Sequence, residues 1–102
     1  ENGAPAKILL ESKVDENDYA QAISIVTRLY QKAKLVHGDY SEYNIFKTPK
    51  GLVLFDLGSA VDLRHPNAQE FLKRDINNIT KFFSKRGIYV EDPIKIFEDI
   101  VR

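Results

Sequence analysis

Apolar residues recur every three or four positions over two long stretches of the chain, and this spacing predicts two amphipathic helices. The first helix runs from about Glu16 to Lys34, after polar residues that can cap its start. The second begins at Pro66 and stops at Gly87, a residue type that commonly ends helices. The apolar positions are Tyr19, Ala22, Ile23, Val26, Leu29, Tyr30 and Ala33 in the first helix, and Ala68, Phe71, Leu72, Ile76, Ile79, Phe82 and Phe83 in the second.

A third, shorter helix is predicted near the end of the sequence. Asp92 is a suitable cap, and Pro93 is favoured at the first helical position because its missing N–H needs no partner there. Its inner stripe is predicted to be Ile94, Phe97 and Val101.

A β-hairpin is predicted between the two long helices. Two short apolar runs, residues 45–47 and 52–55, flank the turn sequence T-P-K-G at residues 48–51. Residues 1–14, by contrast, show no clear period and are interpreted as an extended lead-in. The elements together predict a helix-rich α+β fold.

Composition indicates one soluble globular domain. The 102 residues carry 15 Lys and Arg against 15 Asp and Glu, and 43% are hydrophobic. The absence of Cys excludes disulfides and thiolate zinc sites. It leaves the redox compartment open but disfavours a secreted scaffold, so the cytoplasm is the default expectation. No apolar run approaches the roughly 20 residues of a membrane span. Without a basic surplus, direct nucleic-acid binding is not the favoured function.

A polar segment carries the candidate chemistry. It reads H-G-D-Y-S-E-Y-N from His37 to Asn44, and D-L-G follows from Asp56. Because the hairpin folds back on itself, Asn44 at its entry and Asp56 at its exit are expected to lie side by side. Magnesium prefers such oxygen ligands and takes only one or two from protein. Asp39 then lies where it could receive the proton of a hydroxyl undergoing phosphorylation.

A carboxylate also falls on the apolar face of the second long helix. Asp75 lies four residues after Phe71 and four before Ile79, so its side chain points toward the core. An unpaired buried carboxylate would be strongly destabilising. We therefore expect Asp75 to accept hydrogen bonds from a nearby loop with free backbone donors.

The order and spacing of these residues resemble the protein-kinase pair H-R-D-L-x-x-x-N and D-F-G. Three departures are Gly38 for the Arg, Leu57 for the Phe, and Ser41 for the Lys of protein-substrate kinases. Only 19 positions separate Asp56 from Asp75, and no A-P-E motif lies between them, so there is little room for an activation segment. Switching through phosphorylation of such a segment is therefore not expected.

With S-E-Y-N, H-P-N-A and F-L-K-R-D-I-N-N-I-T-K-F-F, the chain resembles the RIO-family atypical serine/threonine protein kinases, and most of all their archaeal-type first subfamily. The segment from Asn2 to Leu9 is similar to the one after that family's interlobe hinge. The resemblance implies a kinase-like carboxyl-terminal lobe, mostly helical, with the active site on the small hairpin. It divides the chain into a post-hinge segment (1–14), a helix (15–34), the catalytic loop, hairpin and D-L-G (35–58), and further helices (66–102).

The same resemblance assigns roles to individual residues. They are Asp39 as catalytic aspartate, Asn44 and Asp56 as metal ligands, Ser41 as a neighbour of the transferred phosphate, Phe46 as the floor of the adenine pocket, and Asp75 as the tie between helix and catalytic loop. The implied cofactors are ATP and Mg²⁺ or Mn²⁺. Because family members also phosphorylate themselves, Asp56 is a hypothetical carrier of phosphate.

Simpler interpretations apply to several of these residues. His37 is expected to give structural support by packing beneath the loop and bonding to backbone, and His65 is expected to be a turn or helix-entry residue. Ser41 is either a loop stabiliser or a phosphate contact. The basic residues of the second long helix form a solvated face, with an RNA-facing patch as the less favoured alternative. They are Lys73, Arg74, Lys81, Lys85 and Arg86.

For the intact protein, the resemblance implies an ATP-dependent kinase or ATPase that acts on a protein substrate or on itself during maturation of the small ribosomal subunit. No glycine-rich loop or strand lysine precedes the hinge-like segment, and the chain opens without Met. We therefore expect only the carboxyl-terminal lobe here, inactive without an amino-terminal lobe. Two alternative functions are a small-molecule phosphotransferase of the same fold and a non-catalytic docking module.

Overall fold

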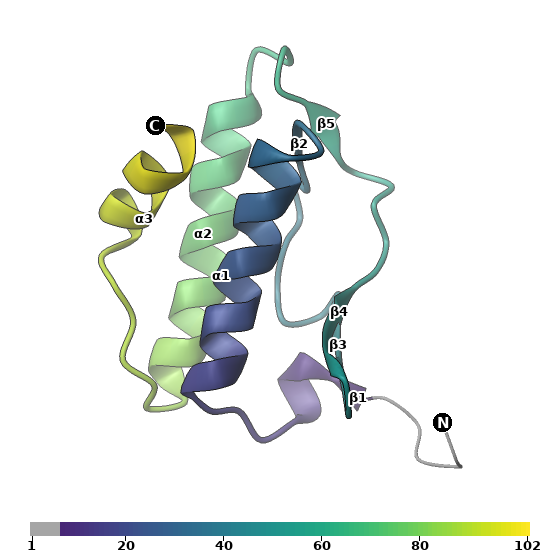
Figure 1. Ribbon diagram of the computed structural model, residues 1–102, viewed down its shortest axis with the longest axis vertical. Coiled ribbons are helices and arrows are strands. Elements are labelled where there is room, and N and C mark those ends of the chain that lie inside the picture. The colour runs from purple at the N-terminus through teal and green to yellow at the C-terminus, as the bar shows by residue number, and fades with distance from the viewer. Residues whose placement is uncertain (1–6) are drawn as a thin grey trace.

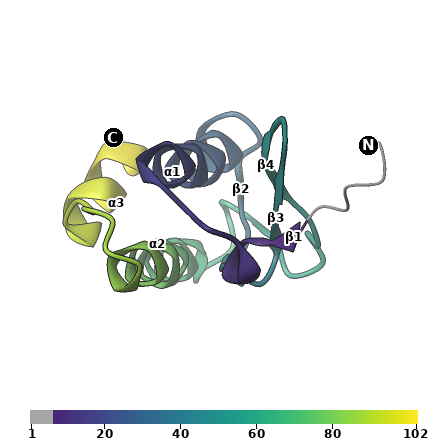
Figure 2. The same ribbon diagram turned by 90° about the horizontal axis from the view of Figure 1, so that it is seen from below.

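Three α-helices and two small sheets make up the computed structural model, which describes residues 7–102 (Figure 1). In chain order the elements are β1 (Lys7–Ile8), a 3-10 helix η1 (Leu9–Glu11), α1 (Glu16–Gln31), β2 (Leu35–Val36), β3 (Ile45–Thr48), β4 (Gly51–Leu54), β5 (Val61–Asp62), α2 (Ala68–Lys85) and α3 (Pro93–Val101). Figure 2 shows the three helices grouped on one side and β1, β3 and β4 on the other. The first residues of the hinge-like segment lie outside the described part.

Helix α1 begins where it was predicted and ends early. Asp15 and Asp18 form a capping box, in which the carboxylate of each accepts the backbone N–H of the other. Asp18 also pairs with Lys47 of β3 at 2.8 Å, which fastens the start of the helix to the hairpin. The predicted end at Lys34 is wrong, because Lys34 has a φ of 60° and turns the chain into β2.

Helix α2 carries the predicted apolar stripe, and its inward residues are almost all buried. It starts two residues after the predicted Pro66, because the backbone N–H of Ala68 instead closes a turn on the carbonyl of His65 at 3.0 Å. His65 Nδ1 also accepts the N–H of Asn67 at 3.0 Å, which confirms His65 as a helix-entry residue. Gly87, with a φ of 82°, ends the helix as predicted.

Helix α3 confirms the predicted cap. Of the predicted inner stripe, Phe97 and Val101 are partly buried against the core, and the prediction is wrong for Ile94. The Asp92 side chain accepts the N–H of Ile94 at 2.9 Å, and Pro93 is the first helical residue. The buried residues are Ile96 and Ile100, each 3% exposed, whereas Ile94 is 67% exposed. Helical spacing allows either stripe, and packing against α1 and α2 selects the one with Ile96 and Ile100.

The sheets match the predicted hairpin and add two pairings. Strands β3 and β4 are antiparallel with Ile45 opposite Leu54, and β1 joins the free edge of β3. The lead-in is therefore not extended throughout, because burial of Leu9 requires the turn made by η1. The short pairing of β2 with β5 was not predicted, since two-residue strands have no readable period.

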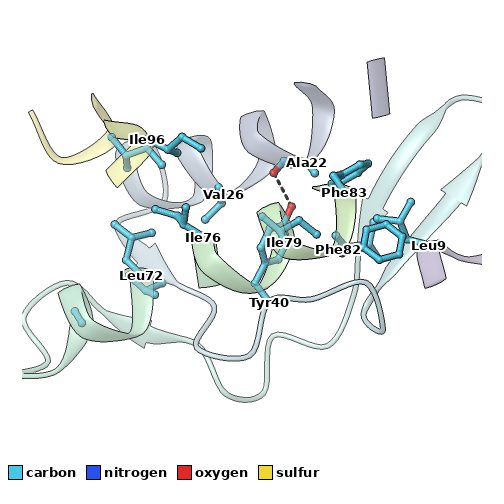
Figure 3. Packing of buried hydrophobic residues seen from close by; sticks show 14 residues of the cluster. Leu9, Ala22, Val26, Tyr40, Leu72, Ile76, Ile79, Phe82, Phe83 and Ile96 are labelled. Carbon is cyan, nitrogen blue, oxygen red and sulfur yellow. Dashed lines mark hydrogen bonds between the residues drawn. The ribbon is translucent and has the colours of Figure 1, made fainter. Parts of the chain in front are cut away.

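The core lies between α1 and α2 and includes a tyrosine from the loop that follows β2. Tyr40 is fully buried, and its hydroxyl donates to the carbonyl of Ala22 on α1 at 2.6 Å (Figure 3). Burial raises the pKa of Tyr40 far above its usual value. The polar loop is therefore anchored inside the helical core, and this anchor fixes the position of the neighbouring candidate site.

Candidate active site

Asp75 of α2 binds the backbone of the loop between β2 and β3, residues 37–44. This carboxylate is fully buried, and its two oxygens accept the backbone N–H groups of Gly38 at 2.9 Å and Tyr40 at 3.1 Å. Burial raises the pKa of Asp75, and these two N–H donors act in the opposite direction. The expectation that Asp75 binds a loop with free backbone donors is confirmed.

His37 supports the same loop through its ring. The side chain is 1% exposed, and Nδ1 accepts the backbone N–H of Asp39 at 3.0 Å. Its carbonyl accepts the Ser59 hydroxyl at 3.0 Å, which ties the loop to the segment after D-L-G. Within residues 7–102, His37 Nε2 is buried without a hydrogen-bond partner. These contacts agree with the predicted structural role.

Gly38, which stands where the kinase pattern has Arg, occupies a position that excludes larger side chains. Its φ is +86°, and a Cβ there would lie 3.0 Å from the carbonyl oxygen of Ser59. The Gly38 carbonyl accepts a hydrogen bond from the Arg74 guanidinium, which also lies over the Phe71 ring at 4.8 Å. Gly38 can replace the Arg of the kinase pattern here because the backbone at Ser59 comes too close to leave space for a side chain.

The five basic residues between Lys73 and Arg86 are all exposed, as predicted, but two of them also bind backbone carbonyls. Arg74 binds the Gly38 carbonyl, and Arg86 donates to the carbonyls of Leu10 and Ser12. Arginine side chains are long enough to reach backbone carbonyls far away in the sequence, so helical periodicity could not find these contacts. The only sequence signal was the position of Arg74 directly before the inward-facing Asp75.

Gly38→Ala is expected to destabilise the chain by more than Gly87→Ala does. Both glycines have positive φ, which costs an L-residue about 1 kcal/mol, but a Cβ at Gly87 meets nothing within 4 Å. The crowding against Ser59 adds a further cost of about 1 kcal/mol at Gly38. Urea unfolding of the two variants measures the difference. Equal losses would contradict the close approach.

Asn44 ties together the loop between β2 and β3. Its side chain is 7% exposed; Nδ2 donates to the Asp39 carbonyl at 2.8 Å, and Oδ1 accepts the Ser41 N–H at 2.9 Å. The Ser41 hydroxyl accepts the N–H of Tyr43 at 3.2 Å, in line with a loop stabiliser. An amide oxygen has two lone pairs, so Asn44 Oδ1 keeps one for another ligand.

Asp56 lies beside Asn44 because the hairpin extends one residue beyond β3 and β4. The N–H of Phe55 donates to the Asn44 carbonyl at 3.1 Å, and Asp56 is the next residue. Asp56 has a φ of 65°, a conformation uncommon for residues other than Gly. Among residues 7–102, its exposed carboxylate accepts only the Gly58 N–H, at 3.2 Å. Strained backbone of this kind concentrates at functional sites.

Asp39 and Phe46 complete the set of predicted site residues. The Asp39 backbone is fixed at both N–H and carbonyl, whereas its exposed carboxylate has no partner within residues 7–102. Phe46 is half-buried and stacks on Phe55 with 4.1 Å between ring centroids.

The oxygen donors of Asn44 and Asp56 suit Mg²⁺, which needs few protein ligands, better than they suit a metal whose ligands all come from the protein. No group of three His, Cys, Asp or Glu side chains suited to a metal occurs in the described part of the chain. One amide and one carboxylate oxygen fit Mg²⁺, which usually keeps water and phosphate oxygens as its remaining ligands.

Comparison with known proteins identifies the family of this chain. A model of the RIO domain matches residues 1–96. The chain belongs to the RIO family. It is 46% identical over 96 residues to the RIO-type serine/threonine-protein kinase Rio1 of Thermoplasma acidophilum, which covers 94% of this chain and 50% of the relative. It is 39% identical over 90 residues to the human serine/threonine-protein kinase RIO1, and this match covers 88% of this chain and 16% of the relative.

Solved structures agree with this assignment and with the predicted kinase-like α+β fold. The Rio2 kinase of Chaetomium thermophilum matches with a TM-score of 0.78 and 26% identity, over 95% of this chain and 34% of that one. The ADP/Mg²⁺-phosphoaspartate complex of the same kinase matches with a TM-score of 0.74 and 25% identity, over 95% of this chain and 33% of that one. The RIO chain thus spans about half or less of these relatives. Within residues 7–102, no helix is long and apolar enough to cross a membrane.

Proposed function

We propose that this RIO chain is the carboxyl-terminal lobe of an ATP- and magnesium-dependent serine/threonine protein kinase or ATPase. The observation that carries the proposal is the double role of Asn44. Its side chain binds the backbone of Asp39 and Ser41, and its own carbonyl binds the N–H of Phe55. Asp39, Asn44 and Asp56 are thereby fastened at one end of the hairpin.

Asn44 Oδ1 and the Asp56 carboxylate would hold Mg²⁺ or Mn²⁺. When bound, the metal neutralises charge on the phosphates of ATP. The Asp39 carboxylate, exposed and without a protein partner in the described residues, accepts the proton of the substrate hydroxyl. The hydroxyl oxygen then bonds to the γ-phosphorus as the bond to ADP breaks. Ser41 contacts the transferred phosphate, and Phe46, stacked on Phe55, forms the floor of the adenine pocket.

The wider role that we propose for the intact protein is the one that the family resemblance implies. Its acceptor would be a protein hydroxyl or the protein itself, and its setting the maturation of the small ribosomal subunit in the cytoplasm. A solved relative described with ADP, Mg²⁺ and phosphoaspartate supports nucleotide and metal use here and the hypothesis that Asp56 carries phosphate. This lobe would work together with an amino-terminal lobe that covers the phosphates.

The test is transfer of labelled phosphate from ATP by the full-length protein that contains this lobe and an amino-terminal lobe. We expect turnover to require Mg²⁺, to stop on chelation, and to fall to the metal-free level in Asp56→Asn. Asp62→Asn is a suitable control, because Asp62 is also exposed but its side chain pairs, in the part of the chain that the structure describes, only with Arg64. A folded protein with no turnover under any of these conditions would favour a docking module instead.

A further inference from the structure

An open groove of about 500 Å³ runs beside the catalytic loop on the side of α2. One wall is the loop segment from Ser41 to Tyr43, which begins two residues after Asp39. The other wall is one row of α2 side chains, Asn78, Lys81 and Lys85. Leu10 and Phe82 give the groove apolar surface, and Arg86 lies beside them. None of these groove residues has a role in the proposed phosphate transfer except Ser41.

The groove is positively charged. Lys81 and Lys85 are exposed and form no salt bridge within residues 7–102. They stand four residues apart on one helix face, where like charges repel and destabilise the helix. Arg86 contributes a third positive charge, and Glu42 is the sole acid among the lining residues. An anionic ligand placed between the two lysines would relieve this repulsion.

The distance from the catalytic loop suits a short extended peptide. Asp75 binds the loop on either side of Asp39, and Lys81 and Lys85 follow it by six and ten residues on the same helix. With a rise of 1.5 Å per residue, they lie about 9 and about 15 Å farther along the axis. An extended peptide advances about 3.4 Å per residue, so these distances correspond to about three and about four residues.

We propose that this groove selects the protein substrate by binding acidic side chains about three to four residues from the hydroxyl that receives phosphate. The proposal rests on the kinase function proposed above. Tyr43, 62% exposed on the rim, offers an aromatic surface against which the peptide backbone packs. A peptide fits better than RNA, because the chain has no net positive charge and the groove offers three cations beside apolar Leu10 and Phe82.

Binding and transfer can be measured separately in the full-length protein. The binding probe is a fluorescent peptide with one serine and glutamates three and four residues away, compared with its glutamine counterpart by anisotropy. We expect the acidic peptide to bind roughly tenfold more tightly at low salt. The double variant Lys81→Gln/Lys85→Gln should lose this difference. Lys32→Gln, at the far end of α1, is the matched control and should retain it.

The outcomes distinguish this proposal from the kinase function. If transfer to the acidic peptide shows a raised KM and an unchanged kcat in the double variant, the groove acts in substrate binding. Equal binding of both peptides overturns the groove proposal even if ATP turnover persists. Selective binding without any transfer overturns the kinase function but keeps the groove. Tighter binding of a single-stranded RNA oligomer, lost in the same double variant, would overturn the choice of a peptide.

Discussion

Asp39→Asn is expected to lower kcat for phosphate transfer by about 10²- to 10⁴-fold, the usual contribution of a general base. Asparagine has nearly the same shape but cannot accept the proton of the substrate hydroxyl. The Asp39 backbone is held through His37 and Asn44 and does not depend on the carboxylate. The KM for ATP and the melting temperature should therefore change little. Labelled-phosphate transfer by the full-length protein measures kcat and KM together.

The control for Asp39→Asn is the same substitution at Asp99, an exposed carboxylate of α3 whose only ion-pair partners among the described residues are Lys95 and Arg102. It should leave turnover unchanged. A turnover in Asp39→Asn equal to that of the wild type would remove Asp39 from the chemistry. A large fall in the melting temperature of Asp39→Asn would show instead that the carboxylate supports the loop, contrary to its exposed position in the structure.

Much of the fold could be predicted because strong local signals agreed with tertiary packing. The apolar stripe of α2 continues over about four turns, from Ala68 to Phe83, and Gly87 follows the end of the helix. The P-x-G turn fixes the register of the hairpin. The face of α3 could not be predicted. Its nine residues include two overlapping stripes, and only contact with α1 and α2 decides between them. Helix α1 ends at Gln31, and Lys34, three residues later, turns the chain toward β2 in a conformation that usually indicates Gly or Asn.

The candidate site could be predicted in outline from one physical requirement. A carboxylate on an apolar helix face must find donors, so Asp75 indicated a buried attachment to a loop before its partners were known. The spacing around the hairpin likewise indicated that Asn44 and Asp56 lie together. The contacts of Arg74 and the crowding at Gly38 could not be predicted, since both depend on how closely α2 and the segment near Ser59 approach the loop.

Asp75→Ala is expected to reduce the free energy of unfolding by about 3 kcal/mol, because it leaves two buried N–H groups without acceptors. These are the N–H groups of Gly38 and Tyr40, and no other acceptor takes their place in the described residues. Asp75→Asn keeps one acceptor oxygen and turns an amide donor toward the other N–H. Its loss should be smaller, about 2 kcal/mol. Urea unfolding of this chain measures both values.

The order of these losses tests the origin of the effect. If the hydrogen bonds to the loop are responsible, Asp75→Ala loses more stability than Asp75→Asn, and both variants also lower kcat because Asp39 lies between the two released N–H groups. Asn77→Ala, an exposed change two residues away on α2, should alter stability by less than about 0.5 kcal/mol. An Asp75→Ala variant as stable as Asn77→Ala would mean that the loop keeps its conformation through Tyr40 and His37 alone.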